Sequence, residues 1–120
     1  MRFSDWLTFD EIAEQVPVEP GLFQIKIREG LLSYPRGKSA MFYYGYSEDL
    51  NYGLQKFSRD ILPRLKMTAE TLFARWMAAE DFELRFKNQL DLFRSNFGSF
   101  PLGNEMLLQQ ETGEHADPEN

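Results

Sequence analysis

The sequence has no cysteine and only one histidine, and both shortages restrict its chemistry. Without cysteine, disulfides, thiolate metal sites and a cysteine nucleophile are excluded. The single histidine, His115, lies near the C-terminus. We therefore expect neither a Ser-His-Asp triad nor a histidine-rich metal site inside the fold. The absence of cysteine also fits a reducing compartment, so we expect a cytoplasmic protein.

Long apolar runs are missing as well. No stretch approaches the ~20 apolar residues that cross a bilayer, and the first residues lack the apolar segment of a secretory signal. We therefore expect no membrane partner. The 120 residues fit a single domain, and contents of 42% hydrophobic and 15% aromatic residues suffice for a packed core.

The net charge of -6 is unevenly distributed along the chain. Residues 105–120 are acidic and contain no lysine or arginine, and without them the acidic and basic residues nearly balance. We expect residues 1–104 to form one folded domain and residues 105–120 to be a disordered tail that adds little stability. Four basic residues cluster mid-chain and are candidates for weak, salt-dependent nucleic-acid binding: Lys56, Arg59, Arg64 and Lys66.

Residue periodicity predicts an α+β domain with a small, mostly antiparallel three-stranded sheet flanked by helices. The expected strands are residues 21–28, 40–46 and 71–78, the last of which also suits a helix. In the first strand, Phe23, Ile25 and Ile27 alternate with polar residues, which predicts one buried and one solvent-facing side. The expected helices are one that follows Thr8 and ends near Gln15, one from about residue 48 that Pro63 closes, and one over 81–95. Residues 29–38 are expected to be a long connection.

Three short segments occur in an informative order. Gly21-Leu22-Phe23 lies in the first strand, Tyr43-Tyr44-Gly45 lies in the second, and Pro101-Leu102-Gly103-Asn104 follows the last helix. This arrangement, over roughly residues 17–104, resembles the GIY-YIG nuclease superfamily. The resemblance implies the α+β fold and cleavage of phosphodiester bonds. It also implies one Mg²⁺ held by a helical glutamate, a tyrosine that helps to activate water and an arginine that stabilises the phosphate.

The resemblance assigns family positions one by one. Tyr43 and Asn104 match the second-motif tyrosine and the closing asparagine. Phe23 stands where the family has the first-motif tyrosine, Gly53 where it has the arginine, and Lys87 where it has the metal-binding glutamate. Three of the family's functional groups are therefore replaced by residues that cannot perform the same chemistry.

Two functional interpretations follow. The first is a catalytically defective binding module without a cofactor, whose partner is nucleic acid, bound weakly, or an unidentified protein. The alternative is a Mg²⁺-dependent nuclease with a rearranged site, in which Glu83 supplies the acid that Lys87 does not. Its candidate residues are Tyr43, Arg59, Glu83 and Asn104.

Single residues leave matching alternatives open. Tyr43 is either a catalytic hydroxyl or a packing aromatic. Gly53 marks either close packing or the loss of the arginine. The aromatic residues of the second strand, which form its core or a surface on which bases stack, are Phe42, Tyr43, Tyr44 and Tyr46.

Overall fold

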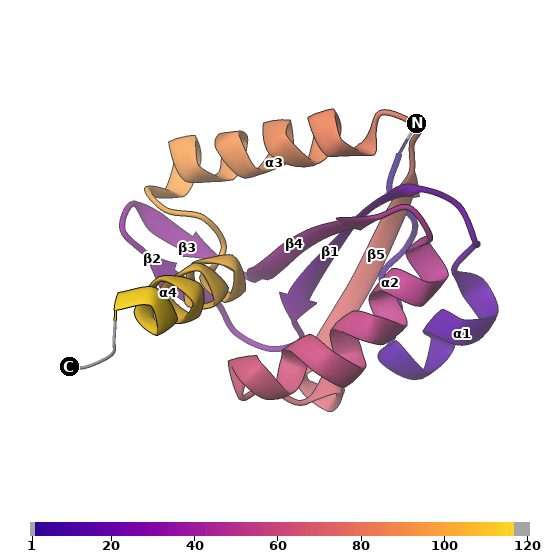
Figure 1. The fold of residues 1–120 in the computed structure, drawn as a ribbon, viewed down its shortest axis with the longest axis horizontal. Coiled ribbons are helices and arrows are strands. Elements are labelled where there is room, and N and C mark those ends of the chain that lie inside the picture. Colours follow the sequence, from indigo (N-terminus) through magenta and orange to yellow (C-terminus); the bar gives the residue numbers. More distant parts are fainter. Residues whose placement is uncertain (1, 117–120) are drawn as a thin grey trace.

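The computed structural model describes residues 2–116, which form an α+β fold around a three-stranded antiparallel sheet (Figure 1). The strand order is β4-β1-β5, with β1 at Gly21–Ile27, β4 at Met41–Ser47 and β5 at Leu72–Ala78. All three predicted strands are confirmed. The two motif-bearing strands are neighbours, and Phe23 pairs with Gly45.

The predicted long connection over residues 29–38 is wrong, because it contains a hairpin formed by β2, Leu32–Tyr34, and β3, Gly37–Ser39. Strands of three residues are too short to show alternation in a sequence. Tyr34 ties this hairpin to the rest of the fold. Its hydroxyl donates to the Met41 carbonyl at 2.6 Å and accepts from the Leu102 amide at 2.9 Å.

One face of the sheet is covered by α1, Ile12–Gln15, and α2, Leu50–Lys56. The main core cluster lies here. Asp49 caps the start of α2, and its carboxylate accepts a hydrogen bond from the Tyr52 amide at 3.0 Å. Contrary to the sequence-based expectation, Pro63 does not close the helical segment. A π-helical turn, Phe57–Ile61, leads into a 3-10 helix, Leu62–Leu65, because a proline is tolerated in the first turn of a helix.

The other face is covered by α3, Phe82–Phe97, which packs against β4 and β1 (Figure 1). Its rings meet those of β4, and the Tyr46 and Phe86 rings stack with centroids 4.6 Å apart. The expectation that the polar side of β1 faces solvent is therefore wrong for Gln24. This residue is only 2% exposed, because α3 lies over it and Gln89 accepts a hydrogen bond from its side chain at 3.2 Å.

Residues 102–116 form helix α4, Leu102–Ala116, so the predicted disorder is wrong for the part of the tail that the structure describes. Met106 and Leu107 pack against the main core cluster. Gln110 bonds the 3-10 helix twice, accepting from Arg64 Nε at 3.2 Å and donating to the Arg64 carbonyl at 2.8 Å. These contacts hold the segment against the fold, although its composition is acidic. Residues 117–120 lie outside the described residues.

Candidate functional site: an aromatic cleft beside helix α2

A cleft of about 280 Å³ opens between β4, α2 and the π-helical turn. It brings together the three positions that the resemblance places at a catalytic centre, namely Phe23, Tyr43 and Gly53. The other residues that line it are Tyr46, Ser47, Tyr52, Lys56, Phe57 and Ile61. The lining is aromatic and includes one cation, and no carboxylate lines the cleft in the part of the chain that the structure describes.

Close contacts explain two glycines, Gly53 at the cleft and Gly45 on β4. A β-carbon at Gly45 would lie 2.4 Å from the Phe23 ring, which covers that glycine. A β-carbon at Gly53 would lie 2.5 Å from the Cβ of Ser47. The structure therefore supports close packing as the reason for Gly53. An arginine at this position, as in the family, would need β4 and α2 to move apart.

Tyr43 packs as an aromatic at the base of the cleft. Its ring centroid lies 4.6 Å from that of Phe57 and 6.3 Å from that of Phe23. Burial raises the pKa of Tyr43 to about 12, and the nearby positive charge of Arg64 opposes this only in part. The hydroxyl is therefore neutral at physiological pH. A hydroxyl that keeps its proton at this pH is not available as a general base to activate water.

Asn104 does not line the cleft, because its side chain is hydrogen-bonded to the edge of β4. Its Oδ1 accepts from the Tyr44 amide at 2.9 Å, and its Nδ2 donates to the Tyr44 carbonyl at 2.9 Å. The side chain thus imitates a neighbouring strand and satisfies both edge groups of Tyr44. This geometry gives Asn104 a structural role.

The two candidate residues on α3 do not line the cleft. Glu83 lies exposed in the first turn of α3, on the helix that packs on the other face of the sheet. Lys87 is exposed and forms an ion pair with Asp91 at 3.3 Å. The structure therefore gathers Tyr43 and Gly53 with Phe23, and leaves both Glu83 and Lys87 outside that group.

The four clustered basic residues have different partners in the fold. Lys56 alone lines the cleft. Arg59 donates two hydrogen bonds of 2.9 Å to the adjacent Asp60. Arg64 is bonded to Gln110, and Lys66 ends the 3-10 helix with a left-handed backbone at a φ of 58°.

The exposed aromatic residues of the cleft are Tyr46 and Tyr52, with exposed fractions of 42% and 54%. Among the aromatics of β4, Phe42 and Tyr44 are buried, so only part of that strand is available for stacking. Sequence reasoning missed Tyr52 because it lies on α2. Its position three residues after the helix-capping Asp49, on the turn that faces the end of β4, was the available signal.

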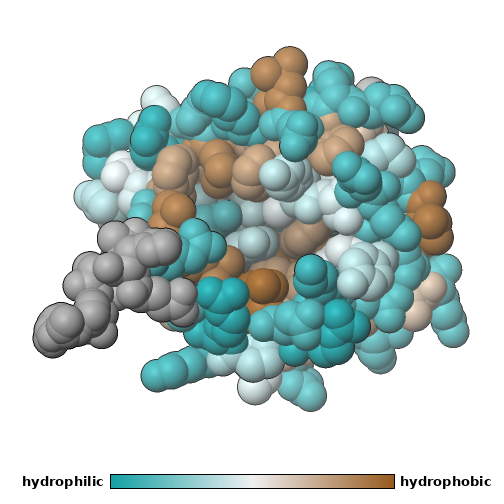
Figure 2. Space-filling model, viewed as in Figure 1, coloured by the Kyte–Doolittle hydropathy of each residue, from teal (hydrophilic) through white to brown (hydrophobic). Residues whose placement is uncertain are grey.

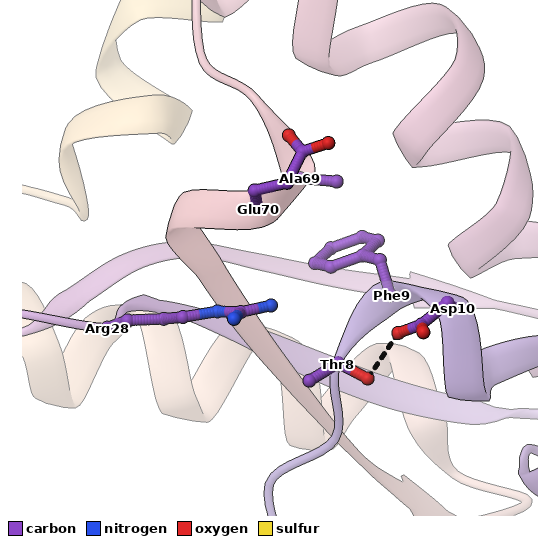
Figure 3. Close-up of a pocket in the computed structure, with 6 residues that line it drawn as sticks. All are labelled: Thr8, Phe9, Asp10, Arg28, Ala69 and Glu70. Carbon is purple, nitrogen blue, oxygen red and sulfur yellow. Dashed lines mark hydrogen bonds between the residues drawn. The ribbon is translucent and has the colours of Figure 1, made fainter.

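A second, larger cavity of about 450 Å³ lies near the start of α1 (Figure 3). The Arg28 side chain extends toward Thr8, whereas the Glu70 carboxylate turns away from it (Figure 3). The Thr8 hydroxyl donates to the Asp10 carboxylate, and this bond contributes most to lowering the pKa of Asp10. The lining charges are of both signs, and none of the residues predicted from the sequence lies here.

No protein-family model matches the sequence, and no curated protein or solved structure matches it. Among residues 2–116, no group of three or more His, Cys, Asp or Glu side chains is placed to hold a metal ion. In the same range, no helix has both the length and the apolar character needed to span a membrane.

Proposed function

We propose that this chain is a non-catalytic module that binds single-stranded nucleic acid in the aromatic cleft. The strongest support comes from the residues that stand in the cleft at the family's catalytic positions. Phe23 has no hydroxyl, Gly53 has no side chain, and the hydroxyl of Tyr43 has a pKa of about 12. Phosphodiester cleavage needs an anionic metal ligand and a cation facing the phosphate. The GIY-YIG resemblance then describes a scaffold whose chemistry is lost.

The same cleft has what base recognition requires. Tyr52 presents an exposed ring on which a base can stack, and Lys56 supplies a positive charge to the same cleft. Stacking on an aromatic side chain contributes about 1–3 kcal/mol per base and needs no particular base. A volume of about 280 Å³ lies just below the roughly 300–1,000 Å³ typical of ligand sites, which suits one flat ring. The π-helical turn that supplies Phe57 and Ile61 is of a kind often found at functional sites.

Binding of a labelled oligothymidine tests this proposal. Tyr52→Ala removes a stacking ring and is expected to weaken binding by about 5- to 150-fold, the equivalent of one stacked base. Lys87→Gln is the matched control, because Lys87 is an exposed cation remote from the cleft, and it should leave affinity nearly unchanged. The proposal is wrong if Tyr52→Ala binds as well as the wild type does.

Incubation of the same strand and of a plasmid with Mg²⁺ or Mn²⁺ distinguishes the nuclease alternative. We expect both substrates to remain intact. Metal-dependent cutting that disappears in Tyr43→Phe or in Glu83→Gln would instead establish a rearranged active site.

A further inference from the structure

A row of cations and aromatic rings occupies the sheet face opposite the cleft. Arg75 Cζ lies 4.6 Å from the Phe3 ring centroid and 4.4 Å from that of Trp6. Lys26 Nζ lies 4.5 Å from the Trp6 centroid and 5.9 Å from that of Phe73. These five residues alternate positive charge with flat rings, and we call them the cation–ring face.

Three separate segments build this face. Lys26 lies on β1, and Arg75 and Phe73 lie on β5, where Lys26 pairs with Phe73. The two rings before β1 are placed by the N-terminal segment, which runs along β5. There the Ser4 amide donates to the Trp76 carbonyl at 2.8 Å, and the Leu7 amide donates to that of Ala74 at 2.7 Å. The fold thus assembles the face from residues distant in sequence.

The cations of this face are not among those that form ion pairs with carboxylates. On the helices, Lys87 and Arg94 pair with Asp91, Arg85 pairs with Asp81, and Arg59 pairs with Asp60. Within the described residues, no ion pair joins Lys26 or Arg75 to a carboxylate. Both side chains remain partly open to solvent. The sheet face therefore carries positive charge that the protein itself does not neutralise.

The guanidinium of Arg75 is oriented by a buried amide. The Oε1 of Gln24 accepts from Arg75 Nε at 2.9 Å and from Nη2 at 2.7 Å. This leaves the Nη1 hydrogens available for a ligand, since arginine has five N–H donors. Burial lowers the pKa of Arg75, and an anion bound beside it would offset part of that desolvation.

We propose that the cation–ring face is a second surface for single-stranded nucleic acid, in addition to the aromatic cleft. Phosphates would contact Lys26 and Arg75, and bases would stack on the partly exposed rings of Trp6 and its neighbours. An acidic protein segment would use the charges but not the rings. Arg28 extends the face, since its Cζ lies 4.6 Å from the Phe73 centroid, but the nearby Asp10 reduces its contribution. The inference does not rest on the cleft, because the two surfaces lie on opposite sides of β1.

Salt titration of oligothymidine binding tests the second surface. Lys26→Gln removes one phosphate contact and is expected to flatten the log-log salt slope by about 0.7, the value for one contact with a single strand. Lys26→Arg should restore the slope, and Lys87→Gln should leave it unchanged. Because Tyr52→Ala affects only the cleft, Lys26→Gln should flatten the slope equally in that background. The two proposals can therefore fail separately.

A slope that Lys26→Gln leaves unchanged, with the thermal melt intact, overturns the inference. Trp6→Leu is the second variant, and it should weaken binding at high salt as well as at low salt, because stacking is not screened. Polyglutamate and phosphatidylserine vesicles serve as competitor probes. Neither should displace the oligonucleotide at matched charge concentration, and displacement by either one would show that the face recognises charge alone.

Discussion

At the scale of single residues, a β-carbon at position 53 would lie 2.5 Å from the Cβ and 2.6 Å from the Oγ of Ser47. Alanine normally favours a helix over glycine by roughly 1 kcal/mol. Here we expect Gly53→Ala to destabilise the protein by about 1–3 kcal/mol, as overpacking does. Denaturant unfolding measures this. Combining it with Ser47→Gly should recover part of the loss, and a stabilising Gly53→Ala would contradict the packing that we describe.

Tyr43 and Tyr44 are expected to make the free energy of unfolding fall as the pH rises in the alkaline range. Burial raises the pKa of each to about 12, above the ordinary value of 10.0. The folded state therefore holds these protons more tightly than the unfolded chain does. The resulting stability is complete below pH 10 and is lost as the pH rises through 12, with up to about 2 kcal/mol at stake per tyrosine.

Unfolding measured from neutral to strongly alkaline pH, with tyrosinate absorbance as a second signal, checks this pH dependence. Tyr43→Phe should show a shallower decline above pH 10 than the wild type does. An unchanged pH dependence in that variant would mean that the Tyr43 hydroxyl is freely solvated.

Asn104 is expected to matter for stability, because its amide satisfies both edge groups of Tyr44. Asn104→Ala leaves those groups unpaired and should cost about 1–3 kcal/mol. Asn104→Asp should also destabilise, since it places a carboxylate oxygen near the Tyr44 carbonyl. Thermal melts of both variants are the measurement. If both variants are as stable as the wild type, the structural role of Asn104 is wrong.

At the scale of elements, α4 is part of the folded core. Removing residues 105–120 deletes Met106 and Leu107 from the main core cluster together with the bonds of Gln110 to Arg64. We expect the truncated protein to lose about 2–3 kcal/mol, because the two side chains are partly buried and full burial of one large apolar side chain contributes roughly 1.5–3 kcal/mol. Removing only residues 117–120 is the control, since it keeps these contacts. Equal stability of both truncations would contradict the docking of α4.

The elements differ in how far the sequence predicts them. The alternation of Phe23, Ile25 and Ile27 and the aromatic run of β4 predict two strands correctly, because period-two burial is a local property. The β2–β3 hairpin is too short to produce such a pattern. Helix α4 depends on contacts of Met106 and Leu107 with distant elements, and a tail composition cannot show those contacts.

Some residues of the candidate sites could likewise be predicted from the sequence, and others could not. Phe23, Tyr43 and Gly53 were predicted to share a site, and they do line one cleft. Tyr52 was missed, because its position depends on how α2 packs against the sheet. The partners of Lys26 on the other face were missed as well, because Trp6 reaches them only through the pairing of the N-terminal segment with β5.

At the scale of the whole molecule, the acidic net charge limits nucleic-acid affinity. The chain carries -6, and four of its cations are paired with carboxylates on the helices. Figure 2 shows the side of the molecule with α3 and α4, where hydrophilic residues surround a hollow of mixed hydropathy. We expect a log-log salt slope no steeper than about -4 for the wild type, since few phosphates can be neutralised. Titration at several salt concentrations gives this slope, and tight binding that ignores salt would contradict it.

The most direct test of the central claim is to map backbone amide chemical shifts while a short oligothymidine is added in the presence of Mg²⁺. The account predicts saturable shifts at the cleft, at Tyr46, Tyr52 and Lys56, and an oligonucleotide that is recovered uncut. Shifts absent from all three residues, or an oligonucleotide cleaved during the titration, would contradict a non-catalytic module that binds single strands in its aromatic cleft.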